Sequence, residues 1–167
     1  MHGFARTIER TQELEDPLAR YLEMISAAAA QMTELLETLS IVARIESGRY
    51  DPVVAEADTL ALARAAAARV EGASAEGTGA TVMVDAEAAE RALAAFASCA
   101  VRHGAAPAVT LRVDGTTVWI GPVNEPARAV ITGAELKDLG AAAAIRLVEA
   151  WGGSAALSGD ELRVSLR

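Results

Sequence analysis

The sequence predicts an α+β fold, in which an N-terminal helical hairpin that forms a dimeric bundle precedes an α/β sandwich with helices on one face of a mixed sheet. Two observations predict this order. Apolar residues recur in steps of four and three through residues 18–45, as on a helix that packs against other helices. Beyond residue 50, short apolar runs with strand spacing alternate with alanine-rich helical segments.

The long helix is the element for which the sequence carries the most signals. Asp16 supplies an N-cap, Pro17 suits the first turn, and Gly48 ends the run, which predicts one helix of about seven turns. Leu35 and Val42 widen the apolar stripe beyond a two-stranded seam, which favours a bundle. The seam consists of Leu18, Leu22, Ile25, Ala29, Met32, Leu36, Leu39 and Ala43.

A shorter helix is expected upstream, over residues 3–14, where Phe4 and Ile8 are spaced as on one helix face. Isolated helices below about 12–15 residues are marginal in water, so this helix must pack on the long one as a hairpin. The apolar surface left over is best covered by a second copy of the chain. We therefore expect residues 1–50 to form a dimerisation domain of a homodimer.

Residues 51–167 are expected to form the α/β domain. A capped helix is predicted over Asp58–Val70, then a Gly/Ser/Ala-rich linker over 71–80 and a strand in "TVMVD". A second helix is predicted over Ala86–His103, closed by Gly104.

The last third of this domain is predicted to hold two hairpins around one helix. Asp114-Gly115 is the turn expected in "VTLRVDGTTVWI", and Gly159-Asp160 is the turn expected in "SAALSGDELRVSL". Between them, the capping-box pattern Thr132 to Glu135 predicts a helix that runs to Ala150 and stops at the following glycine pair.

Composition excludes several classes of function. The formal net charge of −8 and the absence of a dense Lys/Arg cluster argue against a nucleic-acid partner. A single cysteine forms no internal disulfide, and no cysteine–histidine spacing typical of zinc ligands is seen, so we expect no metal. The alanine runs are too short for a membrane span and the N-terminus lacks an apolar signal region, which predicts a cytoplasmic protein.

Three stretches, "GFARTIER", "LLETLSIVARIESGRY" and "DLGAAAAIRLVEAWGGS", resemble the core of sensor histidine kinases. The resemblance spans nearly the whole chain. It implies a dimerising helical hairpin followed by an ATP-binding domain of the Bergerat type, and a response-regulator receiver domain as the partner. It also lets the catalytic parts of that family be compared with this sequence.

The phosphoacceptor motif of the family, a pattern like His-Glu-x-x-x-Pro, is missing. His2 directly precedes the Gly-Phe-Ala segment, too late in the hairpin to match, and His103 belongs to the other domain. Either the motif is lost or it lies upstream of the sequence given.

The asparagine box is altered as well. In "SCAVRHG", Ser98 and Cys99 stand where the family pattern has Asp and Asn, so the magnesium ligand that the resemblance implies is lost. Mg²⁺ takes oxygen ligands, and a neutral thiol replaces them poorly. We expect Cys99 to be a small buried hydrophobe. Arg102 matches a basic position near the phosphates, or is a solvated residue at a helix end.

The boxes that bind adenine and the phosphates also depart from the family pattern. In "VWIGPVNEP", Ile120 stands at the aspartate that accepts the adenine amino group, and Pro122 at the first glycine. Asn124 or Glu125 either substitutes from the loop or is solvated. In the last glycine box only Gly140 remains, and Asp138 stands at the first glycine, where its carboxylate would repel a phosphate. The segment 121–138 is also short for an ATP lid.

Three readings follow. The favoured one is a catalytically degenerate dimer with no catalytic residue and no cofactor, which docks or regulates a response regulator. Its docking face on the long helix would include Gln31, Glu34, Thr38 and Arg44, which otherwise form a solvated face.

Two alternatives stay open. One is an active kinase core that binds Mg-ATP through Arg102, Asn124, Lys137 and Gly140. The other is a histidine phosphotransferase, which needs an accessible histidine on the hairpin, where only His2 is available.

Overall fold

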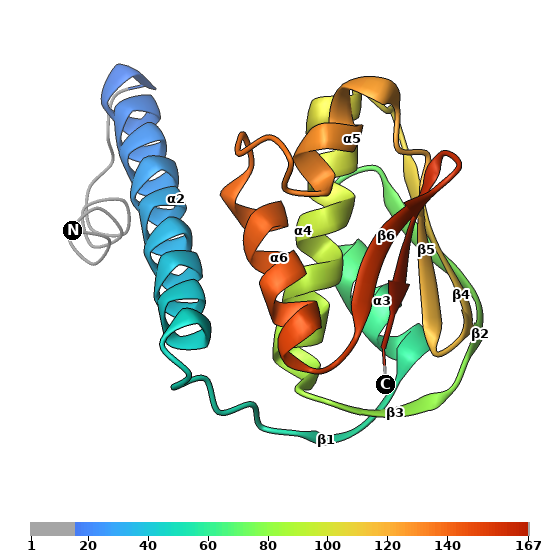
Figure 1. The fold of residues 1–167 in the computed structure, drawn as a ribbon. Coiled ribbons are helices and arrows are strands. Elements are labelled where there is room, and N and C mark those ends of the chain that lie inside the picture. The colour runs from blue at the N-terminus through green and yellow to red at the C-terminus, as the bar shows by residue number, and fades with distance from the viewer. Residues whose placement is uncertain (1–15, 167) are drawn as a thin grey trace. The chain divides into compact units, whose positions relative to one another are not determined.

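The computed structural model describes residues 16–166 of the 167-residue chain. It confirms the predicted fold class, a helical segment followed by a mixed α/β domain (Figure 1). The chain divides into two compact units, Met1–Ser40 and Ile41–Arg167. The domain boundary expected after residue 50 stays a prediction. The elements are α2 (Asp16–Glu46), β1 (Ala55–Asp58), α3 (Thr59–Ala68), β2 (Ala73–Gly79), β3 (Thr81–Val84), α4 (Ala86–Gly104), β4 (Val109–Gly115), β5 (Thr117–Gly121), α5 (Glu125–Ile131), α6 (Leu139–Ala150), β6 (Ser154–Ser158) and β7 (Glu161–Ser165).

Helix α2 is the long helix that the heptad spacing predicts. It ends as expected at Gly48, which has a φ of +64°, and the Arg49 amide donates to the Arg44 carbonyl at 2.8 Å. Asp16 is the first described residue, so its role as a cap is not tested. The expected helix over 3–14 and His2 lie outside the described residues. Five seam residues are each at least half exposed: Leu18, Ile25, Met32, Leu36 and Leu39.

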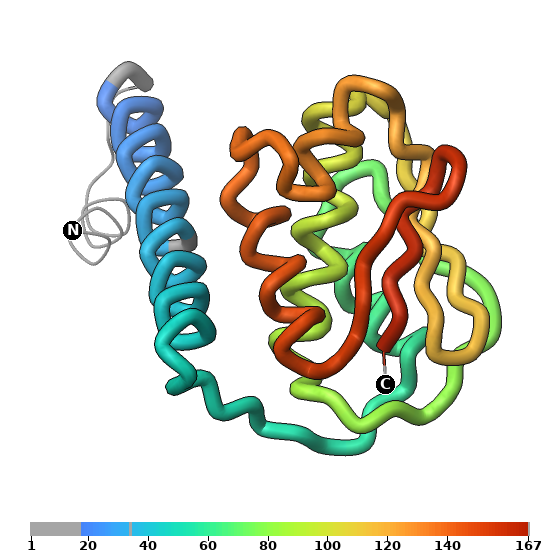
Figure 2. Tube along the Cα trace, in the orientation of Figure 1, coloured from blue at the N-terminus to red at the C-terminus, as the bar shows by residue number. Residues whose placement is uncertain are grey.

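The second unit is built on a five-stranded mixed sheet with the order β2-β4-β5-β7-β6. Strand β2 pairs parallel with β4, and the other pairs are antiparallel. Strands β1 and β3 form a separate antiparallel pair. Helices α3, α4 and α6 cover one face of the large sheet (Figure 1). The Cα trace shows the β4–β5 and β6–β7 hairpins side by side (Figure 2).

Helix α4 is the central helix of this unit and contacts α3, α5 and α6. It contributes the fully buried Leu93 and Phe96, which pack with Leu111, Ile120 and Leu162 from the sheet. Asp85 caps the helix, because its carboxylate accepts from the Ala88 amide at 3.1 Å. The predicted end is wrong by one residue: Gly104 is the last helical residue, and Ala105 takes the left-handed conformation with a φ of +48°.

The expected linker over 71–80 is wrong, because Ala73–Gly79 form the edge strand β2. The small residues fit because the strand lies close to its neighbour. At Gly77 an added Cβ would collide with the Val113 carbonyl oxygen of β4. Low side-chain volume here reflects a close backbone approach and not a flexible connection.

Two further expectations are corrected near the site. The β4–β5 turn is Gly115-Thr116 and not Asp114-Gly115, because Asp114 pairs with Thr117. The helix expected after Thr132 begins only at Leu139, with Asp138 as its cap, and a short helix α5 precedes it. The β6–β7 hairpin has the predicted Gly159-Asp160 turn.

Among residues 16–166, no helix carries an apolar stretch of the length that crossing a lipid bilayer requires.

Candidate functional site

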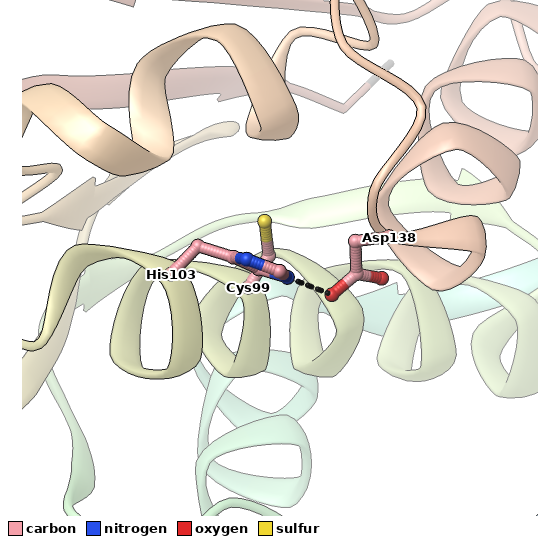
Figure 3. A group of neighbouring side chains, drawn as sticks. All are labelled: Cys99, His103 and Asp138. Carbon is pink, nitrogen blue, oxygen red and sulfur yellow. Dashed lines mark ion pairs between the residues drawn. The ribbon is translucent and has the colours of Figure 1, made fainter.

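The candidate site lies where the last turns of α4 meet the start of α6. Cys99 and His103 are four residues apart on α4, so they lie on one face of that helix. Asp138 caps α6 and points toward them (Figure 3). One ligand-type atom from each residue, a thiol sulfur, an imidazole nitrogen and a carboxylate oxygen, lies within 4.8 Å of the other two.

Asp138 is the member of this cluster that links α4 to the start of α6. Its side chain is only 7% exposed. Oδ1 accepts from the Ala141 backbone amide at 3.0 Å, which is the capping contact. Oδ2 lies 3.3 Å from His103 Nε2 and 3.5 Å from an Arg102 guanidinium nitrogen. These are ion-pair distances, but neither buried Oδ2 nor His103 Nε2 has an aligned hydrogen-bond partner.

Cys99 is fully buried, as the sequence predicts. The pKa of its thiol is raised to about 12, mainly by burial and secondarily by the Asp138 carboxylate, while the Arg102 guanidinium opposes the shift. The thiol is therefore protonated at neutral pH and packs as a small apolar group.

The residues expected to contact a nucleotide gather around the same helix end but already have protein partners. Arg102 is 65% exposed and donates to Ser98 Oγ at 2.9 Å as well as facing Asp138. Asn124 donates through its amide to the Gly104 carbonyl at 2.8 Å. Lys137 pairs with Glu135 at 2.7 Å. A Cβ added at Gly140 would lie 3.2 Å from Asp138 Oδ1, so this glycine gives the carboxylate room.

The position at which the resemblance places the adenine-binding aspartate is apolar. Ile120 is fully buried in β5, between Leu111 on β4 and Leu162 on β7 in the strand register. After Pro122 the chain folds into α5, which buries Val130 and Ile131. The segment expected to be a short lid therefore contributes to the core and contacts α4.

The residues expected to dock a partner lie on α2. Gln31 and Glu34 are three residues apart, and Thr38 follows four residues later, so the three positions share one face of the helix. Gln31 is exposed and Thr38 is half-buried. Arg44 lies six residues beyond Thr38, on another side of the helix, and its guanidinium is 5.9 Å from the centre of the Tyr50 ring.

The role of His103 was missed by sequence reasoning. A Cys-x-x-x-His spacing on a predicted helix was the available signal, because it places both side chains on one face. The third member comes from another helix, and no local pattern could supply it. The expectation that the chain binds no metal is not tested by this structure, and the cluster offers the donor atoms that would be needed to overturn it.

No protein-family model and no curated protein sequence matches the chain. Solved structures do. Full-length ShkA in complex with AMPPNP is 24% identical at a TM-score of 0.67, and the match covers 97% of this chain and 40% of that one. The histidine kinase AdeS from Acinetobacter baumannii is 18% identical at a TM-score of 0.62, covering 96% and 90%. ThkA, solved in complex with the response regulator protein TrrA, is 15% identical at a TM-score of 0.52. That match covers 98% of this chain and 55% of the ThkA chain.

The chain thus spans less than half the length of ShkA and most of the length of AdeS. Both matches include the long helix and the α/β domain, since they cover nearly all of this chain. The chain therefore has the fold of a sensor histidine kinase core.

Proposed function

We propose that this chain is a cytoplasmic, dimeric two-component signalling protein that uses the histidine kinase scaffold to dock or regulate a response regulator, without transferring phosphate from ATP. The α/β domain would serve as a contact body and the long helix as the dimerisation and docking element.

The proposed loss of nucleotide binding is supported mainly by one observation. The Asp138 carboxylate caps the start of α6. Free amides at a helix N-terminus attract phosphate. Here Asp138 Oδ1 accepts from the Ala141 amide, and the carboxylate adds a negative charge where a phosphate would approach. The buried Ile120 supports the same conclusion, because an alkyl group accepts no hydrogen bond from adenine. An unmade hydrogen bond of that kind costs about 1–3 kcal/mol, up to about two decades in affinity.

The proposed partner class rests on two observations. ThkA, whose fold this chain shares, was solved with a response regulator bound. The polar positions Gln31, Glu34 and Thr38 lie together on α2, apart from the apolar seam. A receiver domain is therefore the partner that we propose for this face.

Thermal unfolding with Mg-ATP or Mg-ADP tests the proposed loss of nucleotide binding. A ligand at a thousand times its Kd stabilises by about 4.1 kcal/mol, which raises the Tm of a domain of this size by roughly ten degrees. We expect millimolar nucleotide to shift the Tm by less than about 1 °C relative to magnesium alone. A dose-dependent rise would support the active-kinase alternative.

Phosphotransfer separates the remaining readings. The chain is incubated with labelled ATP and, separately, with a phosphorylated receiver domain encoded in the same genome. We expect no label on the chain in either case. Label from ATP would identify a kinase, and label from the receiver would identify a histidine phosphotransferase.

Docking is measured by titrating the receiver domain into the chain. Thr38→Ala should weaken binding, whereas Thr33→Ala should not, since Thr33 lies on another part of α2 and its hydroxyl donates to the Ala29 carbonyl. No binding by any encoded receiver domain would contradict the docking proposal.

A further inference from the structure

We propose that Cys99, His103 and Asp138 form a site for one Zn²⁺ ion, with a water molecule as the fourth ligand. This site goes beyond the proposed signalling role. A bound zinc ion would neutralise the Asp138 carboxylate, so the repulsion of phosphate by this carboxylate applies to the metal-free chain.

The ligand chemistry favours zinc. A thiolate, an imidazole and a carboxylate are the three side-chain groups that bind zinc in proteins, and three protein ligands plus a water complete a tetrahedral shell. Mg²⁺ prefers an all-oxygen shell, so the sulfur and nitrogen atoms argue against it. The one-turn spacing of Cys99 and His103 on α4 holds two of the ligands on a rigid element.

The distances fit a tetrahedral ion. Zinc–nitrogen and zinc–oxygen bonds of about 2.1 Å place the two ligand atoms about 3.4 Å apart, and His103 Nε2 lies 3.3 Å from Asp138 Oδ2. Sulfur–nitrogen and sulfur–oxygen edges of a zinc site are about 3.6 Å. The three ligand atoms here lie within 4.8 Å of one another, so binding of the ion would have to draw the Cys99 sulfur closer to the other two atoms.

Two buried polar atoms independently indicate a missing partner. His103 Nε2 and Asp138 Oδ2 face each other, and neither makes an aligned hydrogen bond with a protein group. Asp138 is more than nine-tenths buried, and a buried carboxylate oxygen that has ion-pair neighbours but no aligned hydrogen bond is incompletely compensated for its lost hydration. A cation between the two atoms would satisfy both. The capping bond of Oδ1 to the Ala141 amide would remain in place.

The charges balance. Zinc replaces the proton on Cys99 Sγ, which passes to solvent, and the imidazole binds in its neutral form. One dication then meets one thiolate and one carboxylate, so the buried cluster is neutral. Arg102, whose guanidinium lies 3.5 Å from Asp138 Oδ2, and the amino end of α6 oppose the cation. Arg102 is 65% exposed, so solvent screens much of this repulsion.

Zinc titration into the metal-free full chain, without an affinity tag that binds metal, tests the site. Competition with a chromophoric chelator gives stoichiometry and affinity, and Co²⁺ serves as the spectroscopic probe. We expect one equivalent per chain, and a thiolate-to-cobalt charge-transfer band with the strong visible bands of tetrahedral cobalt. A spectrum without the charge-transfer band would overturn the proposal, because Cys99 is the only cysteine in the chain.

Variants assign the ligands. Cys99→Ser, His103→Gln and Asp138→Asn should each weaken zinc binding by at least about a hundredfold, beyond what loss of an outer-shell partner causes. The matched control is Asp58→Asn, since Asp58 caps α3 through the Ala61 amide at 2.8 Å and should leave zinc affinity unchanged. Arg102→Gln should strengthen binding a few-fold by removing a competing charge.

Circular dichroism identifies any variant that fails to fold. His103 is partly exposed and at the end of α4, so His103→Gln is the variant that keeps the test decisive if the buried substitutions unfold. Zinc affinity unchanged in folded His103→Gln would overturn the site.

Discussion

At the scale of single residues, two departures from the kinase pattern meet in space. Cys99 stands where the resemblance places the magnesium-binding asparagine, and Asp138 stands at a glycine of the phosphate-binding box. The fold brings both to one buried point with His103 between α4 and α6. The Asp138 carboxylate has the Arg102 guanidinium 3.5 Å away and accepts the capping bond from the Ala141 amide. In the structure, Cys99 and Asp138 therefore share one buried environment.

The raised pKa of Cys99 predicts a pH-dependent contribution to stability in metal-free protein. The pKa of the thiol is about 12 in the folded chain against an ordinary value of 9.0, so the unfolded chain loses the thiol proton first as the pH rises. The contribution is complete below pH 9 and declines between pH 9 and 12, with a slope of at most about 1.4 kcal/mol per pH unit.

Urea unfolding of the natural chain and of Cys99→Ala, with a chelator present, measures this contribution. The stability difference between the two proteins should be constant from about pH 7 to 8.5 and should shift against the natural chain above pH 9. A difference that does not change up to about pH 10.5 would show that the thiol titrates normally in the folded state.

At the scale of elements, the sequence was informative where apolar periodicity or a turn signal was strong. Helix α2, helix α4 and the β6–β7 hairpin were predicted close to their observed bounds. Strand β2 was not, because "EGASAEGTGA" carries small and polar side chains that are also typical of linkers. Its strand character comes from parallel pairing with β4, a contact between segments far apart in the chain. The Cys99–His103–Asp138 cluster escaped prediction for the same reason.

Substitution of Gly77 tests whether the close approach of β2 to β4 explains why β2 is built from small residues. Its φ is +111°, and an added Cβ would collide with the Val113 carbonyl of the paired strand. Gly77→Ala should therefore lower the free energy of unfolding by more than about 3 kcal/mol, through strain and lost pairing with β4.

Gly115→Ala is the matched control. Gly115 has a φ of +59° with nothing within 4 Å of its added Cβ, so only the conformational cost of about 1–2 kcal/mol applies. Denaturant unfolding of both variants measures the difference. Equal losses would mean that the close approach of β2 to β4 is not what requires glycine at position 77.

At the scale of the whole molecule, the two units differ in how much of their apolar side-chain surface is exposed. The α/β unit has a core cluster of buried apolar side chains from its helices and its sheet. The first unit instead leaves the seam of α2 exposed in a single chain, with Met32 at 63% and Leu36 at 67%. An exposed apolar stripe with heptad spacing is typical of a helix that pairs with other helices. We therefore propose a second copy of the chain as a partner of this face.

The dimer prediction is tested by placing charge on the seam. Ile25 and Met32 are half or more exposed in the single chain. A buried Ile or Met contributes about 1.5–3 kcal/mol, and a symmetric interface contains each residue twice, so Ile25→Glu with Met32→Glu should weaken the dimer more than a hundredfold. Gln31→Glu with Thr38→Glu adds the same charge to the other face of α2 and should leave the dimer intact.

Light scattering at roughly tens of micromolar chain gives the mass of each protein, and circular dichroism checks that α2 still forms. A natural chain that is monomeric under these conditions would contradict the dimer, as would a charge-seam variant that keeps the natural mass.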